Sequence, residues 1–388
     1  MKTHDVIVVG GGPVGNKVAS LLAKEYDVLV TEEHRVPGKP IQCAGLVSEE
    51  VLELSGVKPT ILNKLYGANI FSPSGRSIEV RSKECKGVLI DRSEFDALMA
   101  TKAEESGATH MYSSRFLSHG IFNNKVIAET DKTTMEASII VGADGHNSVL
   151  SKTIENNRPA EYVRGILADV KYTADDQDLV NIRMGSETAP GFFSWEIPFG
   201  DMTRIGLCTS WDAGPPSVYL KALMKKIGLD DKAIVDKYCG RIPMGGQRRT
   251  YADHLLLAGD AACQVKPVSG GGLHPAFMSS FALAETVTEA FDENDFSEKF
   301  LSVYEKRWKR AVGKELKRGY TLRKMYTSMN DNELNRAMNA FSSESVRNML
   351  RDTSIDRPSN LLFRMMKDPM TMMRLMPIMA KAMIRSIV

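Results

Sequence analysis

The stretch Asp5-Val-Ile-Val-Val-Gly10-Gly-Gly-Pro-Val-Gly15 joins an apolar run to a glycine-rich turn. The run at residues 5–9 is continuous, which indicates a strand buried in a parallel sheet. After the turn, Val18, Leu21 and Leu22 recur at helical spacing, and residues 28–31 form a second apolar run. The order strand, glycine turn, helix and strand predicts a β-α-β unit, and therefore an α/β fold.

The glycines of this turn have the spacing G-x-G-x-x-G, at Gly10, Gly12 and Gly15. The first permits a tight turn, the second lets the backbone approach a pyrophosphate, and the third lets the helix pack on the strand. The helix that begins near Pro13 and Val14 presents N–H donors and a positive dipole to phosphates. Glu32 ends the second strand, where a carboxylate accepts hydrogen bonds from ribose hydroxyls. We therefore predict a dinucleotide site here.

Two more apolar runs end in small-residue turns that carry an aspartate. Residues 139–141 lead into Gly142-Ala143-Asp144-Gly145, and residues 255–258 lead into Gly259-Asp260. Both are typical of parallel strands whose carboxyl ends border a ligand crevice. We expect them to extend the dinucleotide site.

A second glycine run and an arginine complete the predicted site. Pro267-Val268-Ser269-Gly270-Gly271-Gly272 precedes a helix expected to open at His274-Pro275, and its backbone N–H groups suit an electron-rich ligand. Asp260 is placed to hold a ribityl or ribose hydroxyl, and Arg92, within residues 91–96, to reach a phosphate. Each has a structural alternative: a helix cap for Asp260, a surface ion pair for Arg92 and an ordinary loop for the glycines.

The middle of the chain changes character. Residues 192–197 and 203–207 are strand-like, and alternation places Phe193, Trp195 and Ile197 on one face. This pattern predicts a second, mostly antiparallel sheet, followed by a helical region after residue 275. A chain of 388 residues is long enough for two or three domains. We expect a dinucleotide-binding domain from segments 1–65, 91–155 and 251–300, substrate-domain strands at 66–90, an antiparallel substrate domain at 156–250, and a helical C-terminal region at 301–388.

Composition excludes several classes of function. Lys and Arg number 50 against 48 Asp and Glu, a net charge of +2 that argues against a nucleic-acid binder. The five cysteines are widely spaced without a C-x-x-C pair, so we expect neither a disulfide framework nor a metal site. The N-terminus shows no signal-peptide pattern, and no run reaches the roughly 18 apolar residues that span a bilayer. A cytoplasmic protein is the resulting expectation.

Methionine is the one unusual feature of the composition. There are 21, and eight lie between Met365 and Met383. The same tail carries four cations and one acid, in the order Lys367, Asp368, Arg374, Lys381 and Arg385. Adaptable thioethers on a basic amphipathic helix suit an anionic bilayer surface, although the methionines could equally cap the core. We expect Pro369 and Pro377 to break the tail into short helices.

The order of these motifs resembles the glutathione-reductase-type flavoproteins, and within them the para-hydroxybenzoate-hydroxylase-like branch. More narrowly, the chain resembles the geranylgeranyl reductase family over about residues 1–330. The resemblance implies FAD as cofactor, reduction of prenyl double bonds as activity and an isoprenoid lipid as substrate. It also implies that the following residues bind the cofactor: Gly10, Gly12, Pro13, Val14, Gly15, Glu32, Cys43, Ala44, Gly45, Arg92, Phe116, Asp144, Gly145, Gly259, Asp260, Pro267, Gly270, Gly271, Gly272 and Leu273.

Three segments support the narrower resemblance. Gln42-Cys43-Ala44-Gly45 is similar to the family's small-residue loop near the flavin, residues 265–272 to its flavin-contacting glycine loop, and residues 190–198 to its P-x-x-Y-x-W-x-F-P motif. The chain departs from that motif at Phe193, where the family has Tyr, and at Ile197, where it has Phe. Cys43, Phe193 and Trp195 are thereby implied as catalytic residues. Sheet core for the aromatics, and a buried space-filler for the cysteine, are the structural alternatives.

The resemblance leaves other functions open. Residues 190–198 are also similar to the W-x-W-x-I-P stretch of flavin halogenases, and a flavin monooxygenase would share every FAD motif. A non-catalytic, membrane-associated flavin-binding protein is the third class. No second G-x-G-x-x-G follows a strand, so the electrons are expected to come from transiently bound NAD(P)H or a ferredoxin-like protein. Peripheral contact with the cytoplasmic membrane is the expectation that follows from a lipid substrate.

Overall fold

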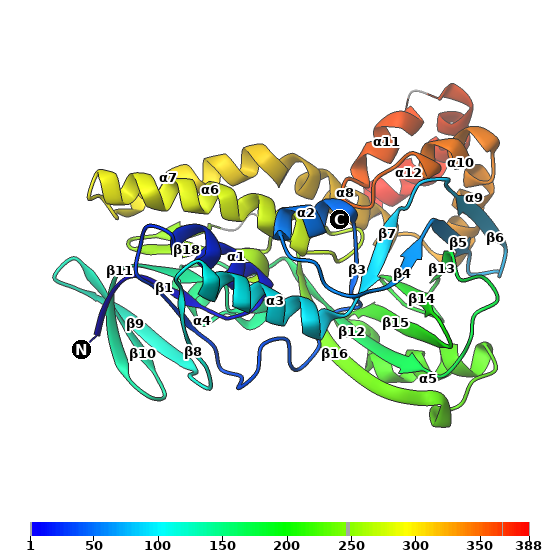
Figure 1. The fold of residues 1–388 in the computed structure, drawn as a ribbon. Coiled ribbons are helices and arrows are strands. Elements are labelled where there is room, and N and C mark those ends of the chain that lie inside the picture. The colour runs from blue at the N-terminus through cyan, green and yellow to red at the C-terminus, as the bar shows by residue number, and fades with distance from the viewer. Residues whose placement is uncertain (1, 246–248, 367, 388) are drawn as a thin grey trace.

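Three β-sheets with surrounding helices make up the protein, seen here in a computed structural model that describes residues 2–245, 249–366 and 368–387. The largest sheet has eight strands, with the central order β17-β18-β11-β1-β2-β8 (Figure 1). Its strands are β1 (Lys2–Val9), β2 (Val28–Thr31), β8 (Thr109–Met111), β9 (Phe116–Phe122), β10 (Lys125–Thr130), β11 (Thr134–Gly142), β17 (Tyr251–Ala252) and β18 (Leu255–Leu257).

The centre of this sheet is parallel, as the apolar runs predict. β1 pairs in parallel with β11 and β2, β11 with β18, and β2 with β8. Pairing aligns the carboxyl ends, because Val9 lies opposite both Thr31 and Gly142, and Gly142 opposite Leu257. The turns that follow β1, β2, β11 and β18 therefore meet at one edge, which places the predicted dinucleotide motifs together.

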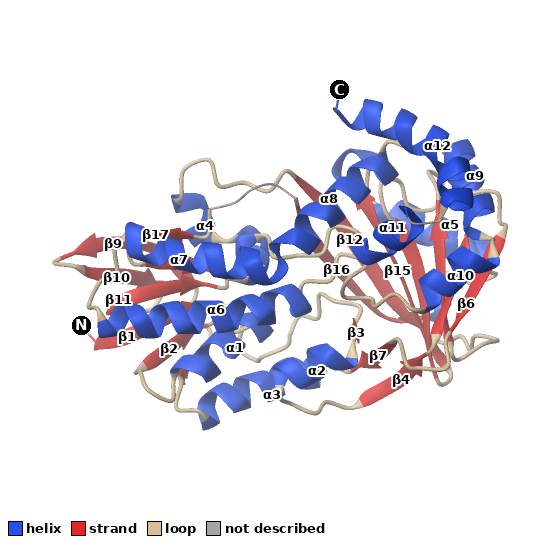
Figure 2. Ribbon diagram, turned by 90° about the horizontal axis from the view of Figure 1, so that it is seen from above, coloured by secondary structure: helices blue, strands red, loops and turns tan. Residues whose placement is uncertain are grey.

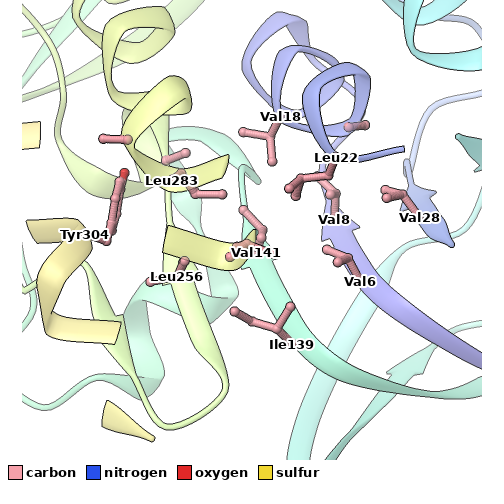
Figure 3. Packing of buried hydrophobic residues seen from close by; sticks show 14 of the residues in the cluster. Val6, Val8, Val18, Leu22, Val28, Ile139, Val141, Leu256, Leu283 and Tyr304 are labelled. Atoms are coloured by element: carbon pink, nitrogen blue, oxygen red, sulfur yellow. The ribbon is translucent and has the colours of Figure 1, made fainter. Parts of the chain in front are cut away.

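Helices cover the parallel strands. On one face, α1 (Pro13–Leu22) contacts α3 (Arg92–Glu105) and α6 (Leu273–Asp292), and α6 in turn contacts α7 (Glu298–Trp308), as Figure 2 shows from above. The core beneath them joins Val6 and Val8 of β1 to Val18 of α1 and Tyr304 of α7 (Figure 3). These side chains are completely buried. Each fully buried aliphatic side chain contributes about 1.5–3 kcal/mol, so this face anchors the glycine turn.

The second sheet has seven strands in the order β16-β12-β15-β14-β13-β5-β6. Its pairs are antiparallel except β13 with β5, so the predicted mostly antiparallel sheet is confirmed. One face packs on α5 (Pro216–Lys226), while α9–α12 lie towards the other side in Figure 1. The strands are β5 (Gly67–Phe71), β6 (Ser77–Arg81), β12 (Glu161–Val170), β13 (Leu179–Met184), β14 (Phe193–Phe199), β15 (Met202–Ser210) and β16 (Ile234–Met244).

A small sheet lies between the two large ones in sequence and in space (Figure 1). It has three strands, β3 (Leu46–Val47), β7 (Gly87–Ile90) and β4 (Ile61–Leu65), in that order. The segment 66–90 thus gives β5 and β6 to the seven-stranded sheet, and β7 to this one. The remaining α-helices are α2 (Glu49–Ser55), α4 (Val149–Thr153), α8 (Lys314–Thr327), α9 (Asp331–Phe341), α10 (Glu344–Arg351), α11 (Ser359–Met366) and α12 (Pro369–Ile387). There are also short 3₁₀ helices, η1 (Gly145–Asn147), η2 (Trp211–Ala213), η3 (Asp231–Ala233) and η4 (Gly259–Ala262), and a π-helical segment, η5 (Lys309–Gly313).

The methionine-rich tail differs from the sequence prediction at one proline. Pro369 does begin a helix, but Pro377 lies inside α12, so the prediction that both prolines break the tail is wrong. An interior proline costs about 3 kcal/mol in a helix. Contacts of α12 with α8, α9 and α11 offset that cost. Lys367, one of the four tail cations, lies outside the described residues. Within the described chain, no helix combines the length and hydrophobicity needed to cross a bilayer.

Candidate functional site

The glycine turn after β1 is closely packed at two positions and open at the third. Gly10 has φ +103°, and a Cβ there would lie 2.4 Å from the Ala143 carbonyl oxygen. A Cβ on Gly15 would lie 1.9 Å from the Gly10 oxygen, so α1 approaches β1 only without side chains. Gly12 faces open space and begins α1 without a side-chain cap, with Pro13 following in the first turn. Free backbone N–H groups around an open position fit a pyrophosphate.

Glu32 closes the adjacent side of the turn. Its Oε2 accepts a hydrogen bond from the Gly11 N–H at 2.7 Å, and its Oε1 accepts one from the His34 N–H at 2.8 Å. These bonds fix the carboxylate at the end of β2. The same Oε1 also lies 2.7 Å from His34 Nδ1. A carboxylate has about four acceptor positions, so about one remains for a ribose hydroxyl.

Asp144 has a structural role in addition to its predicted one. Its Oδ2 accepts a hydrogen bond from the Val149 N–H at 2.7 Å, which caps α4. Its Oδ1 is buried, and no partner for it occurs among the described residues. Burial raises the pKa of this carboxyl, although its hydrogen bonds oppose the shift. The neighbouring Gly145 has φ +72° and an open side, as a loop that borders a ligand requires.

Asp260 lies in η4, directly after β18, at the sheet edge where the dinucleotide motifs meet. A Cβ on Gly272 would lie 3.2 Å from its Oδ1, so the carboxylate rests on the backbone of the second glycine run. Burial raises the pKa of Asp260 to about 6, and the charge of Arg92 opposes this shift. Gly259, with φ +66°, packs against Val14 and so brings η4 onto α1. The helix-cap alternative for Asp260 is not realised, since no side-chain cap occurs at η4.

Arg92 is buried rather than a surface residue. Its guanidinium donates two hydrogen bonds to Asp96 Oδ1, at 3.1 and 2.9 Å, and contacts the Cys43 side chain. Burial alone would lower the pKa of Arg92, but Asp96 and Cys43 raise it above its ordinary value. The guanidinium is thus a buried cation whose charge also acts on the Asp260 carboxylate.

The loop that carries Cys43 is held between the seven-stranded sheet and the small sheet. Arg204 of β15 forms a buried ion pair with Asp169 and donates from Nη1 to the Ala44 carbonyl at 2.7 Å. Gly45, with φ +78°, fits against the Ile90 carbonyl, where a Cβ would lie 2.8 Å away. The Asp169–Arg204 pair was not predicted, because the two residues are distant in the chain and no local pattern links them.

The second glycine run contacts an aromatic cluster of the seven-stranded sheet. A Cβ on Gly270 would lie 3.0 Å from Ile242 and 3.4 Å from the ring of Phe192. On the other side, Pro267 lies against Gly319 of α8, with a Cβ distance of 3.1 Å. Gly270–Gly272 therefore lie between Asp260 and the aromatic strand β14.

Phe193 and Trp195 extend this cluster. The Phe193 ring stacks on Phe192 with centroids 4.5 Å apart and meets Trp195 edge-on at 6.1 Å. Trp195 lies flat on Gly206, whose Cβ would be 2.5 Å from the indole, and no partner for its buried Nε1 occurs in the described chain. Both rings are only partly buried, whereas Ile197 is fully within the core. The predicted shared face is present, but Ile197 acts there as core.

Two other predicted cofactor residues also pack in cores. Phe116, at the start of β9, is 7% exposed and packs with Ile7 and Val9. Leu273 begins α6 and packs against the cluster that contains Val47. Any contact of these two with a cofactor remains a prediction.

A buried ion pair that the sequence did not indicate joins the glycine run to the C-terminal region. Lys266 Nζ donates to Asp356 Oδ1 at 2.6 Å and to the Ile355 carbonyl at 3.0 Å. The two side chains are 9% and 2% exposed. Burial would raise the pKa of Asp356, yet Lys266 holds it below its usual range. The only available signal was a lysine beside an apolar glycine loop.

Helix α8 supports the aromatic strand from the same region. Arg323 is 2% exposed, pairs with Glu161 at 2.8 Å and lies 5.4 Å from the ring centroid of Phe192. The Tyr326 hydroxyl donates to the Phe192 carbonyl oxygen. The C-terminal helices thus help to fix the aromatic cluster.

These features together define an FAD-binding protein. The open Gly12, the fixed Glu32 carboxylate and the Asp260 carboxylate beside a glycine run fit the pyrophosphate, ribose and ribityl parts of FAD. Residues 3–219 match the family described as "FAD binding domain". FAD is therefore the cofactor of this protein.

Comparison with known proteins identifies the family within the FAD-binding proteins. The chain is 30% identical over 373 residues to the digeranylgeranylglycerophospholipid reductase of Methanothrix thermoacetophila, covering 89% of this chain and 93% of that one. It is 29% identical over 393 residues to digeranylgeranylglycerophospholipid reductase 2 of Methanothermobacter thermautotrophicus, covering 96% and 98%. A geranylgeranyl bacteriochlorophyll reductase-like structure from Thermoplasma acidophilum superposes with TM-score 0.85 at 25% identity, covering 97% and 100%. The chain belongs to the geranylgeranyl reductase family and is an FAD-dependent oxidoreductase.

The halogenase resemblance extends to the fold alone. The flavin halogenase PltM, solved with FAD, superposes with TM-score 0.66 at 16% identity. That identity carries no conclusion about activity.

Proposed function

We propose that this protein saturates carbon–carbon double bonds in the geranylgeranyl chains of membrane lipids. The observation that carries the proposal is the apolar wall of Phe193 and Trp195, in the cluster that Gly270 contacts. A half-buried aromatic wall beside a flavin suits a long hydrocarbon chain. The lipid-reductase names of the relatives support the same substrate class.

The chemistry of an isolated alkene explains what the site contains. Reduced FAD, when bound, supplies a hydride to one alkene carbon, and a proton must reach the other. An unactivated alkene develops no oxyanion, so hydrogen-bond donors gain little, and orientation and water exclusion carry the catalysis. Phe193 and Trp195 orient the chain and exclude water. Because Phe193 has no hydroxyl, the proton comes from elsewhere.

Cys43 is the side chain that we assign to this proton. Its thiol is free and half-buried, and it lies beside Arg92 in a loop that Arg204 ties to the seven-stranded sheet. The buried Arg92 beside it keeps the thiol in one place, so that a proton can be delivered to one defined alkene carbon. Cys43 thus holds the proton, and Arg92 positions it.

The test uses holoprotein that dithionite has reduced without air. With a geranylgeranyl lipid, mass spectrometry should find a gain of two hydrogens per saturated bond. Trp195→Ala should slow this saturation at least about tenfold, since it removes the wall that orients the chain. Phe122→Ala, at an aromatic side chain 66% exposed, is the matched control and should match the wild type. Unchanged lipid with rapid oxygen consumption would show a monooxygenase, and no turnover of either kind a non-catalytic flavoprotein.

We further propose that α12 places the enzyme on the bilayer surface. Met373, Met376 and Ile384 are 66%, 60% and 66% exposed, and their spacing gathers them on one side of the helix. Lys381 is exposed on the same helix, which suits anionic lipid. Met365 and Leu375 are buried instead, so the tail both packs on the core and presents an apolar face.

Substitution on this face tests the membrane contact more cleanly than deletion, which would expose the core. The triple change Met373→Glu, Met376→Glu and Ile384→Glu should weaken sedimentation with anionic vesicles at least about tenfold, because each apolar side chain contributes about 1.5–3 kcal/mol when buried in lipid. Val218→Glu, at an exposed valine of α5, is the control. The flavin spectrum should stay unchanged. Equal vesicle binding by the triple variant would contradict the proposal.

A further inference from the structure

Three side chains that can bind a metal ion meet next to the second glycine run. They are Glu50 of α2, His274 in the first turn of α6 and Asp356 in the segment before α11, and we call them the carboxylate–histidine cluster. Each offers one ligand atom, and the three atoms all lie within 4.8 Å of one another. His274 follows Gly270–Gly272 closely in the chain, so the cluster adjoins the predicted flavin contacts.

Two members of the cluster are deeply buried. The side chains of His274 and Asp356 are 5% and 2% exposed, whereas that of Glu50 is 39% exposed. Carboxylates are almost never fully buried unless they are paired or coordinate a metal ion. The half-exposed Glu50 leaves one side of the cluster open to water, through which an ion can enter. The cluster therefore differs from an ordinary acidic patch on the surface.

One oxygen of the buried carboxylate has no partner. Lys266 Nζ donates to Asp356 Oδ1 at 2.6 Å. Asp356 Oδ2 is buried as well, yet it accepts no hydrogen bond from residues 2–245, 249–366 or 368–387. A buried acceptor left unpaired costs about 1–3 kcal/mol. A ligand at Oδ2 would remove this cost, which is an indication of an ion that is independent of the spacing of the cluster.

The spacing within the cluster is close to that of a tetrahedral metal site. His274 Nε2 lies 3.2 Å from Glu50 Oε1. In a tetrahedral site with bonds of about 2.0–2.1 Å, neighbouring ligand atoms are about 3.3 Å apart. The histidine and the glutamate thus already have the separation of two ligands of one ion. The third ligand atom lies within 4.8 Å, so a movement of at most about 1.5 Å brings it to the same spacing.

The ligand types favour a transition metal. Mg²⁺ and Ca²⁺ prefer oxygen ligands alone, whereas one imidazole nitrogen with two carboxylates suits Zn²⁺ and related divalent ions. The two carboxylates also match the charge of such an ion. Three protein ligands leave a fourth position for water, which the open side at Glu50 admits. No cysteine takes part, so the cysteine spacing could not indicate this site.

Two protein cations already contact the carboxylates of the cluster. Lys266 engages only Oδ1 of Asp356, and hydrogen bonds of this kind commonly orient a carboxylate that binds a metal with its other oxygen. Arg357 contacts Glu50 Oε1 at 3.1 Å and is 53% exposed, so its guanidinium can turn into solvent when an ion binds. Arg357 is thus a competitor of the ion, and its removal should strengthen binding.

We propose that the carboxylate–histidine cluster binds a divalent transition-metal ion of the Zn²⁺ type. The ion ties together α2, the start of α6 and the segment before α11. Because α6 begins directly after Gly270–Gly272, the bound ion restrains the glycine run and slows the release of FAD. The ion takes no part in the reduction of the alkene, so this inference goes beyond the proposed function and does not depend on it.

The test is calorimetric titration of Zn²⁺ into holoprotein that a chelator has freed of metal. The wild type should bind one ion per chain at the cluster. Glu50→Gln and His274→Gln should each weaken this binding at least about tenfold, since each removes one of three ligands. Arg357→Gln should strengthen it severalfold, because it removes the competing cation. His4→Gln, at a histidine that contacts the single carboxylate of Asp27, is the control and should bind like the wild type.

The rate of FAD release tests the effect of the ion. Saturating Zn²⁺ should slow release at least about fivefold in the wild type and leave the rate of Glu50→Gln unchanged. If His274→Gln misfolds, Glu50→Gln and Arg357→Gln, at partly exposed side chains, decide the question. Equal Zn²⁺ affinity in the wild type and these variants would overturn the site, and an unchanged release rate would overturn the restraint. Failure of lipid saturation would contradict the proposed function alone.

Discussion

Asp260→Asn is expected to stabilise the apoprotein at neutral pH and at the same time to weaken flavin binding. Burial raises the pKa of Asp260 from 3.8 to about 6. Between these values the native state binds more protons than the unfolded state, so stability falls as pH rises through this window. Above pH 6 the penalty is complete, at about 2 kcal/mol after allowance for partial exposure. Asparagine removes it.

Flavin binding should change in the opposite direction. Asparagine loses the charged acceptor for a ribityl hydroxyl, which is worth about 1.5–3 kcal/mol, or roughly ten- to a hundredfold in Kd. Urea unfolding of the apoprotein at several pH values measures the first effect, and fluorescence titration with FAD measures the second. Asp201→Asn, at an exposed loop position, is the control. Parallel stability curves for the variant and the wild type from pH 4 to pH 7 would contradict the assigned burial of this carboxylate.

Lys266→Met is expected to destabilise the protein by about 3–5 kcal/mol, because it leaves the Asp356 carboxylate buried without its cation. The measured quantity is the free energy of unfolding from denaturant titration. The loss should also loosen the glycine run that Lys266 precedes, so flavin release should become faster. An effect of this size is a large share of the stability of a typical domain.

A second substitution distinguishes the lost pair from lost packing. Lys266→Met combined with Asp356→Leu should recover most of the stability, since an apolar pair of similar volume replaces a buried ion pair at little cost. Lys221→Met, in an exposed pair with Asp231, should change stability by less than about 1 kcal/mol. If the double variant is as unstable as the single one, the side-chain volumes rather than the charges maintain this contact.

The dinucleotide-binding half of the fold could be predicted from the sequence because its sequence patterns are local. The apolar run at 5–9, the glycine spacing and the run at 28–31 each fall within a few residues, and β2 has the predicted bounds. Backbone constraints at Gly10 and Gly15 leave no alternative residue there. The order of motifs then sufficed for the family and the cofactor.

The rest of the site depends on pairings between distant residues. Asp169 with Arg204, Glu161 with Arg323, and Lys266 with Asp356 each join separate elements, and no local pattern distinguishes them from surface charges. The prediction for Pro377 failed because it also considered only the local sequence. Its helix-breaking tendency is local, whereas the contacts of α12 that override it are tertiary.

The strands of the three sheets alternate along the chain, and this order affects how the two halves of the protein can move and fold. It enters the eight-stranded sheet with β1, the small sheet with β3, the seven-stranded sheet with β5, and later returns to each of them. No continuous stretch of sequence therefore contains a complete sheet, and neither half could be expressed or exchanged as a separate module. A hinge between the halves would have to bend several chain crossings together. The proposed lipid would accordingly bind beside β14 without a hinge motion that opens the two halves.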